Sequence, residues 1–248
     1  MSNYTSSITG TMKQIIQLES VEKGKSFMIA GSPYGRIIYE SSGDWATGPE
    51  YHAYGQRNSG KKDENLNFIE RFFVDVHDTQ EARFAGDGEA VPYVRKTALR
   101  NSAALGVGLT SYGSIFEAAL NGASLYIRPD VLLAAEYDIT LRPHEVKNTF
   151  LRNTYFNSIT ELSSEGNKKC WIHAPGSILK KKLCDGESIC VDPACFVGVS
   201  YAKNPKAKLI PTADSEPALR EAIGFDFFFA ITAVDSPVDV YISTLPFR

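Results

Sequence analysis

Four cysteines could bind a metal ion or form disulfides, since thiols support both kinds of chemistry. Structural zinc sites generally hold cysteines in close pairs such as Cys-x-x-Cys. No such pair occurs here, because the last three cysteines are six and five positions apart. We therefore expect reduced thiols that bind no metal and mostly act as small buried hydrophobic residues: Cys170, Cys184, Cys190 and Cys195.

Asp75 and His77 are the other candidate metal ligands. They are two positions apart, so in a strand they would share one face, where Glu81 or Asp87 could complete a site. An exposed polar strand face explains the same spacing without a metal, and we favour that interpretation. The sequence predicts neither a metal site nor a cofactor.

A nucleophilic serine would need the motif Gly-x-Ser-x-Gly. Among the occurrences of the tripeptide Gly-x-Ser are those that begin at Gly24, Gly122 and Gly186, and the second glycine is missing from each of these. The pair Gly106 and Gly108 is too short to form a dinucleotide-binding motif. Because Gly-x-Ser recurs, a role in turns explains it better than an active site, and we expect no catalytic residues.

The segments that follow Gly122 and Gly186 resemble each other at a fixed offset of 64 residues. In each, the glycine is followed by serine, by two alternating apolar residues, and by Pro129 or Pro193. Glycine permits a turn with positive φ, alternating apolar residues face one side of a strand, and proline interrupts a strand. A weaker third copy starts at Gly24, 98 residues before Gly122. Each copy predicts a turn, a strand, a kink and a strand, and the copies must pack together to bury their apolar faces.

Strand-forming residues dominate most other segments. The sequence therefore predicts an all-β fold of stacked antiparallel sheets with internal pseudo-repeats. We expect one domain, 1–248, with repeat units near residues 15–40, 115–150 and 165–210. One short helix is expected over 215–223, because Ser215 can cap it and Gly224 can end it. Residues 41–66 are rich in Gly, Ser, Asn and charge, which predicts a long exposed loop.

Five aromatic residues lie in or beside the expected loop. Tyrosine and tryptophan bury a large area at low entropic cost, so they often anchor interfaces. They are candidates for binding a protein partner, with ordinary packing against a sheet as the alternative: Tyr34, Tyr39, Trp45, Tyr51 and Tyr54.

The net charge is −3 and the pI is near 5.9, which argues against a nucleic-acid partner, because phosphate binding depends on clustered positive charge. No apolar run reaches the length of about 18 residues that a membrane helix needs. The first residues lack the apolar core of a signal peptide. We therefore expect a soluble protein without an integral membrane segment, located in the cytoplasm, with the mitochondrion as the alternative.

Five stretches carry a family resemblance: 153–160, 169–176, 185–193, 224–232 and 240–244. They resemble the altered-inheritance-of-mitochondria family, of the tryptophan-RNA-binding-attenuator-like β superfamily. The resemblance covers about residues 115–248, whereas 41–114 has no clear counterpart. It implies stacked antiparallel sheets with pseudo-symmetry, homo-oligomers, no established catalytic residues and, for some members, a link to organising the mitochondrial inner membrane.

Together these features predict a non-enzymatic structural, assembly or scaffolding protein that forms homo-oligomers. One alternative is a virion or phage shell component, which a long all-β chain without catalytic motifs would also suit. The other is a β-barrel enzyme acting on a sugar or small ligand. That enzyme would need a pair of carboxylates in a cavity, for which Asp185, Glu187 and Asp192 are the local candidates.

Overall fold

The computed structural model describes residues 7–8, 14–31, 35–53, 91–110, 112–145, 156, 158–201, 208–212, 228–233 and 237–247. In these ranges the chain forms antiparallel strands and two single turns of 3-10 helix, η3 (Pro129–Val131) and η4 (Pro193–Cys195). The predicted all-β fold is confirmed. The helix expected over 215–223 lies outside the described residues. No helix in the described part of the chain is both long and apolar enough to cross a membrane.

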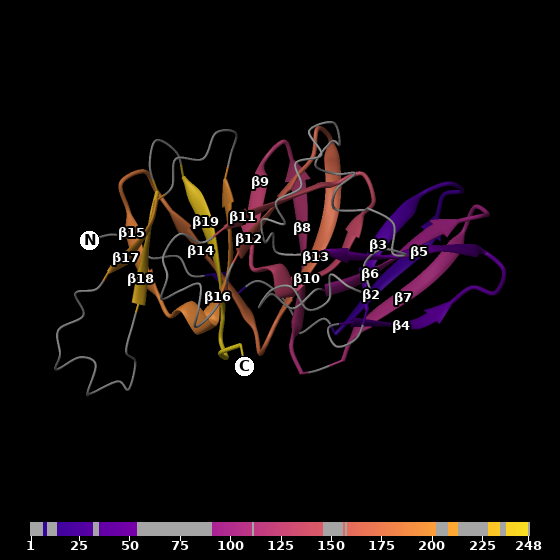
Figure 1. Cartoon of the computed structure of the whole chain (residues 1–248), viewed down its shortest axis with the longest axis horizontal. Helices are drawn as coiled ribbons and strands as arrows, with labels where there is room; N and C mark the ends of the chain where they lie inside the picture. Colours follow the sequence, from indigo (N-terminus) through magenta and orange to yellow (C-terminus); the bar gives the residue numbers. More distant parts are fainter. Residues whose placement is uncertain are drawn as a thin grey trace, which may run out of the picture.

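The strands, in chain order, are β1 (Ser7–Ile8), β2 (Ile15–Val21), β3 (Ser26–Ala30), β4 (Gly35–Glu40), β5 (Trp45–Ala53), β6 (Val91–Ala98), β7 (Ala103–Leu109), β8 (Ser114–Asn121), β9 (Ser124–Ile127), β10 (Leu132–Glu136), β11 (Thr140–Glu145), β12 (Ser158–Ser163), β13 (Asn167–Ala174), β14 (Ile178–Leu183), β15 (Ser188–Val191), β16 (Phe196–Tyr201), β17 (Lys208–Thr212), β18 (Phe228–Thr232) and β19 (Val238–Ser243). They form four sheets, ordered β1-β14-β19-β16-β9-β12-β11, β5-β6-β3-β10-β13-β8, β15-β18-β17 and β2-β7-β4. In Figure 1 the sheets follow one another along the long axis, with β15, β17 and β18 at one end and β4 and β7 near the other.

The same pattern of strand pairing occurs in three consecutive groups of six strands. In the first group, β7 lies between β2 and β4, and β6 lies between β3 and β5. The second group, β8–β13, and the third group, β14–β19, have the same neighbours when each strand number is raised by six or by twelve. Neighbouring groups are joined at two junctions, where β3 pairs with β10 and β9 pairs with β16.

The two junctions also have matching registers. Ile29 lies opposite Ala134 in the first junction, and Ile127 lies opposite Gly198 in the second. Ile127 follows Ile29 by 98 residues and Gly198 follows Ala134 by 64, which are the offsets between the Gly-x-Ser segments. The pairing of distant strands therefore follows the same spacing as the sequence similarity.

Each group also has a register shift at the corresponding place in one ladder. The shifts lie between Ile37 and Tyr39 in β4, between Leu132 and Ala134 in β10, and between Phe196 and Gly198 in β16. The residues within the three shifts are Ile38, Leu133 and Val197. A register shift of this kind bends a strand and redirects its side chains, so these three residues occupy equivalent places in the fold.

The expected turn conformation is found at the three glycines that open the repeated segments. Gly24, Gly122 and Gly186 have φ values of +86°, +69° and +80°, a region that other residues reach only at a cost. Pro129 and Pro193 then open η3 and η4, so the kink that the sequence predicts is a single 3-10 turn.

Buried apolar side chains fill the space between the sheets. The larger cluster consists mostly of residues from the first two groups, such as Phe27, Leu105 and Leu133, and also includes Val197 and Tyr241 from the third. A second cluster lies mostly in the third group, with Phe196 and Val240, and also includes Ile159 of β12. Neither cluster belongs to one sheet alone, which explains why a single strand unit could not form a core.

The prediction of one exposed loop over 41–66 is wrong for residues 45–53. They form β5, which pairs with β6 at the edge of a sheet. Gly48 and Pro49 lie at a register shift between Thr47 and Glu50, where a proline that cannot donate a ladder hydrogen bond is tolerated. The loop-forming residues thus mark a bulge inside a strand. Residues 54–66 lie outside the described residues.

Candidate interaction edges

Asp75, His77, Glu81 and Asp87 lie outside the described residues. Within the described ranges, no three His, Cys, Asp or Glu side chains are placed to share a metal ion. His173 is buried with its Nε2 atom 2.8 Å from the backbone oxygen of Asp130. Burial lowers the pKa of His173, because it disfavours the charged imidazolium.

Two of the three carboxylates considered for an enzyme accept hydrogen bonds from backbone N–H groups. An oxygen of Glu187 accepts a hydrogen bond from the Cys184 N–H at 2.7 Å, which closes the turn around Gly186. Asp192 accepts from the Ala194 N–H at 2.8 Å and so caps η4. Asp185 is exposed in the same turn. Two of these three groups therefore have structural partners.

A shallow groove of about 260 Å³ lies beside β8, β14 and β19, somewhat below the usual volume of ligand pockets, about 300–1,000 Å³. Its two carboxylates are both ion-paired. Asp239 lies 2.9 Å from Lys180, and Glu117 lies 2.7 Å from Lys169. The hydrogen bond to Glu117 raises the pKa of Lys169, since it favours the charged ammonium.

Two of the four cysteines are at least partly buried and two are exposed. Cys170 is fully buried, and this burial raises the pKa of its thiol to about 12. Cys195 is half-buried, and burial raises its pKa too. Cys184 and Cys190 are exposed free thiols, so the prediction of burial is wrong for them. Cys184 lies in the turn before β15 and Cys190 on β15 itself, an edge strand that one neighbour covers.

The aromatic candidates that the structure describes differ in how deeply they are buried. The Trp45 side chain is buried at 8% exposure, and its ring meets that of Phe27 edge-on with centroids 6.4 Å apart. The alternative interpretation, ordinary packing against a sheet, therefore applies to Trp45. Tyr39 is 37% exposed at the end of β4. Tyr51 lies in β5, whereas Tyr34 and Tyr54 lie outside the described residues.

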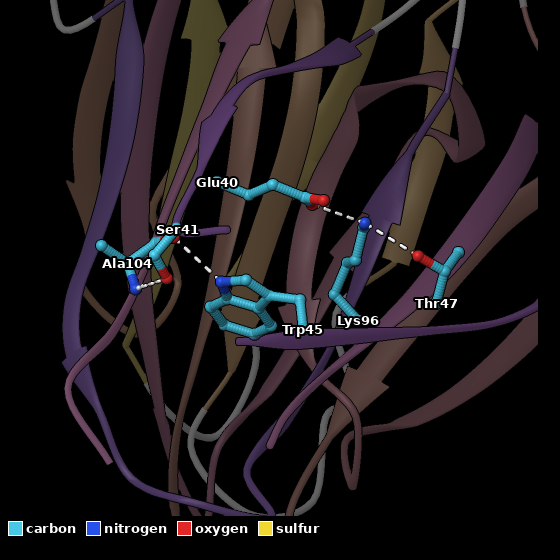
Figure 2. A network of polar contacts seen from close by, with 6 residues as sticks. All are labelled: Glu40, Ser41, Trp45, Thr47, Lys96 and Ala104. Atoms are coloured by element: carbon cyan, nitrogen blue, oxygen red, sulfur yellow. Dashed lines mark hydrogen bonds and ion pairs between the residues drawn. The ribbon is translucent and has the colours of Figure 1, made fainter. Parts of the chain in front are cut away.

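Figure 2 shows a polar network that fixes the end of β4 against its neighbours. Trp45 donates from Nε1 to the backbone oxygen of Ala104 at 2.9 Å, and Ser41 accepts from the Ala104 N–H at 3.1 Å. The Lys96 ammonium donates to Glu40 at 2.6 Å and to Thr47 at 2.9 Å. These contacts link Glu40 and Ser41, at the end of β4, to strands β6 and β7, and they link Trp45 and Thr47 of β5 to the same two strands.

Next to this network the terminal sheet β2-β7-β4 exposes an apolar strip. Ile15, Ile38 and Tyr39 have exposures of 44%, 43% and 37%. A Cβ atom added to Gly106 would lie 2.2 Å from the Tyr39 ring, and one added to Gly108 would lie 2.8 Å from Ile38. The two glycines, which had no role in the sequence, therefore make room for Tyr39 and Ile38 to lie over β7.

Strands β4 and β15 are thus the candidate interaction edges. In the described part of the chain, β4 pairs with β7 alone and β15 pairs with β18 alone. An edge strand presents unpaired N–H and C=O groups that can accept another strand. Sequence reasoning named Tyr39 and Cys190 but found neither edge, because strand pairing is not visible in a single segment.

Comparisons with known proteins agree with this fold. The crystal structure of a protein from Streptococcus pyogenes matches with a TM-score of 0.61 and 13% sequence identity, covering 98% of this chain and 94% of that one. At that identity the likeness shows the fold alone. No curated protein matches the chain in sequence. The family model described as mitochondrial biogenesis AIM24 matches residues 76–223, more than half of the 248 residues. The chain therefore belongs to the mitochondrial biogenesis AIM24 family, as the resemblance in its sequence predicted.

Proposed function

We propose that this chain is a non-catalytic assembly protein that associates with further copies of itself. The observation that carries the proposal is that β4 and β15, which lie toward opposite ends of the molecule, each lack in the described ranges the junction partner that their counterparts in the other groups have. An edge strand that is not protected tends to pair with another chain. Ile38 and Tyr39 on β4 add apolar area that a partner would bury.

The chemistry of the described residues supports a non-catalytic role. Glu187 and Asp192 bind backbone N–H groups, and Glu117 and Asp239 are paired with lysines. A carboxylate that acts as general acid or base must instead reach a substrate. No described residue favours a sugar-acting enzyme or a virion shell over an assembly protein.

The three strand groups are, in this proposal, copies of one repeated unit. Their shared pairing order, their matching register shifts and the common offsets of the two junctions support it. A repeat protein stacks its units so that each contacts its neighbours, and its terminal units need a cap or a partner. The proposed locations are the cytoplasm or, given the family, the mitochondrion.

Sedimentation velocity and light scattering of the purified chain test this function. We expect a mass that rises with protein concentration, or a fixed mass that is a multiple of 27.3 kDa. A mass of one chain at every concentration would contradict self-assembly. Loss of a specific turnover in the variants Asp185→Asn and Glu187→Gln would contradict the non-catalytic role.

A further inference from the structure

Each of the two edge strands lacks a neighbour that its counterparts have. In the second and third groups, β10 pairs with β13 and also with β3, and β16 pairs with β19 and also with β9. Their counterpart β4 pairs only with β7 in the described ranges. In the same way β3 and β9 have two neighbours each, whereas β15 has only β18. The junction therefore occurs twice inside the chain, and β4 and β15 are each one strand of a further junction whose other strand is missing from the described ranges.

One side chain on β4 is exposed where its counterparts on β10 and β16 are buried. Ile38, Leu133 and Val197 occupy the equivalent register shifts of β4, β10 and β16. Leu133 and Val197 are 0% exposed, whereas Ile38 is 43% exposed. The second and third groups bury this position and the first group leaves it open.

The same contrast is found on β15. Cys190 follows Tyr126 of β9 by 64 residues, and Tyr126 follows Met28 of β3 by 98. Met28 is 0% exposed and Tyr126 is half-buried, whereas Cys190 is exposed. Both ends of the array thus expose positions that a junction covers elsewhere.

We propose that β15 of one copy pairs antiparallel with β4 of a second copy and so forms a third junction of the same kind. The proposal deepens the proposed self-assembly and rests on it. The internal junctions define the register: Ile127 lies opposite Gly198, and the corresponding residues at the ends are Val191 and Tyr39. Cys190 then lies opposite Glu40, one step further along the strands.

A second copy is the occupant that fits, because one chain carries both halves of the junction. The two edges lie toward opposite ends of the array in Figure 1, so the β15 edge of one copy does not reach its own β4. The contact joins unlike surfaces, since β15 meets β4 and never another β15. Such head-to-tail contacts close into rings when the rotation allows and otherwise extend into filaments.

Disulfide trapping tests this register with the native thiol of Cys190. Directly opposite residues in antiparallel strands have Cα atoms about 4.5–5.5 Å apart, which a disulfide can span. All variants carry Cys184→Ser, which removes the exposed thiol nearest Cys190. Under mild oxidation, Glu40→Cys should give disulfide-linked copies, and peptide mapping should place the bond between positions 40 and 190.

Three matched variants make the result interpretable. Arg36→Cys puts a thiol on the same strand about 13 Å from position 40, so it should give several-fold less linked product. Adding Cys190→Ser to Glu40→Cys should abolish the product. Glu40→Ser removes the Lys96 ion pair without adding a thiol, so its melting temperature shows what Glu40→Cys costs in folding.

A charge test probes the same pair without oxidation. Cys190→Glu would place a carboxylate opposite Glu40, and like charges in that position repel, so the dissociation constant should rise by about two- to fivefold. Cys190→Lys at the same exposed position should leave the constant unchanged or lower it. Equal effects of the two variants would overturn the register.

The outcomes separate this proposal from the proposed function. If the chain self-associates but Glu40→Cys links no better than Arg36→Cys, the junction is wrong and assembly uses another surface. If the 40–190 disulfide forms within one copy, leaving the mass unchanged, the chain covers its own edge and the proposal fails. A strictly monomeric chain would overturn both.

Discussion

The Lys96 ammonium lies 2.6 Å from a carboxylate oxygen of Glu40 and joins strand β6 of one sheet to strand β4 of another. The Lys96 side chain is 7% exposed and that of Glu40 is 41% exposed. The buried partner therefore depends on the exposed one for its charge compensation.

Removing each partner separately should have unequal effects. Glu40→Ala leaves the Lys96 charge buried with the Thr47 hydroxyl, so we expect the free energy of unfolding to fall by about 1–2 kcal/mol. Lys96→Met should cost less, because it leaves no buried charge behind. Urea unfolding measures both, with the exposed Glu19→Ala as control. A larger loss for Lys96→Met would show that the lysine stem, rather than the ion pair, stabilises this contact.

Trp45 and Tyr39 should differ in the same kind of measurement. Trp45→Ala removes a buried ring and the hydrogen bond to Ala104, and we expect a loss of about 3 kcal/mol. Tyr39→Ala removes a partly exposed side chain and should cost under about 1 kcal/mol. Its effect should fall on self-association, measured by sedimentation. Equal losses of stability would mean that Tyr39 is part of the core.

Gly106 should tolerate alanine only when Tyr39 is absent. The new Cβ atom would lie 2.2 Å from the Tyr39 ring, and we expect Gly106→Ala to cost about 1–3 kcal/mol through overpacking. In a Tyr39→Ala background most of that cost should disappear, which a double-mutant cycle measures. Gly166→Ala is the control, because no atom lies within 4 Å of its added Cβ. Additive effects would contradict the contact.

Cys170 should make stability depend on alkaline pH. Burial raises the pKa of its thiol from 9.0 to about 12. Since the folded pKa lies above the unfolded one, this contribution to stability is complete below pH 9 and is lost as pH rises toward about 12. Between pH 8 and pH 10 the wild type should lose about 1 kcal/mol more free energy of unfolding than Cys170→Ala. Burial also raises the pKa of Tyr241, so some decline should remain in the variant. Identical declines would show that Cys170 ionises freely.

The sequence by itself determined the local conformations and the class of the fold. Gly122 and Gly186 adopt positive φ, and Pro129 and Pro193 start 3-10 turns. These outcomes follow from the steric properties of glycine and proline, which depend on a residue and its immediate neighbours. The all-β fold and the family were likewise recognisable, because strand propensity and motif spacing are written along the chain.

Tertiary structure alone decided which residues are exposed at the edges. Cys190 was expected to be buried but is exposed, and Trp45 was a candidate for the surface but is buried. The environment of a strand residue depends on how many neighbours its strand has and on what packs over it. Those neighbours come from segments distant in the chain, as when Ile29 meets Ala134. Period and composition describe one segment at a time, so they could not distinguish an edge strand from a central one.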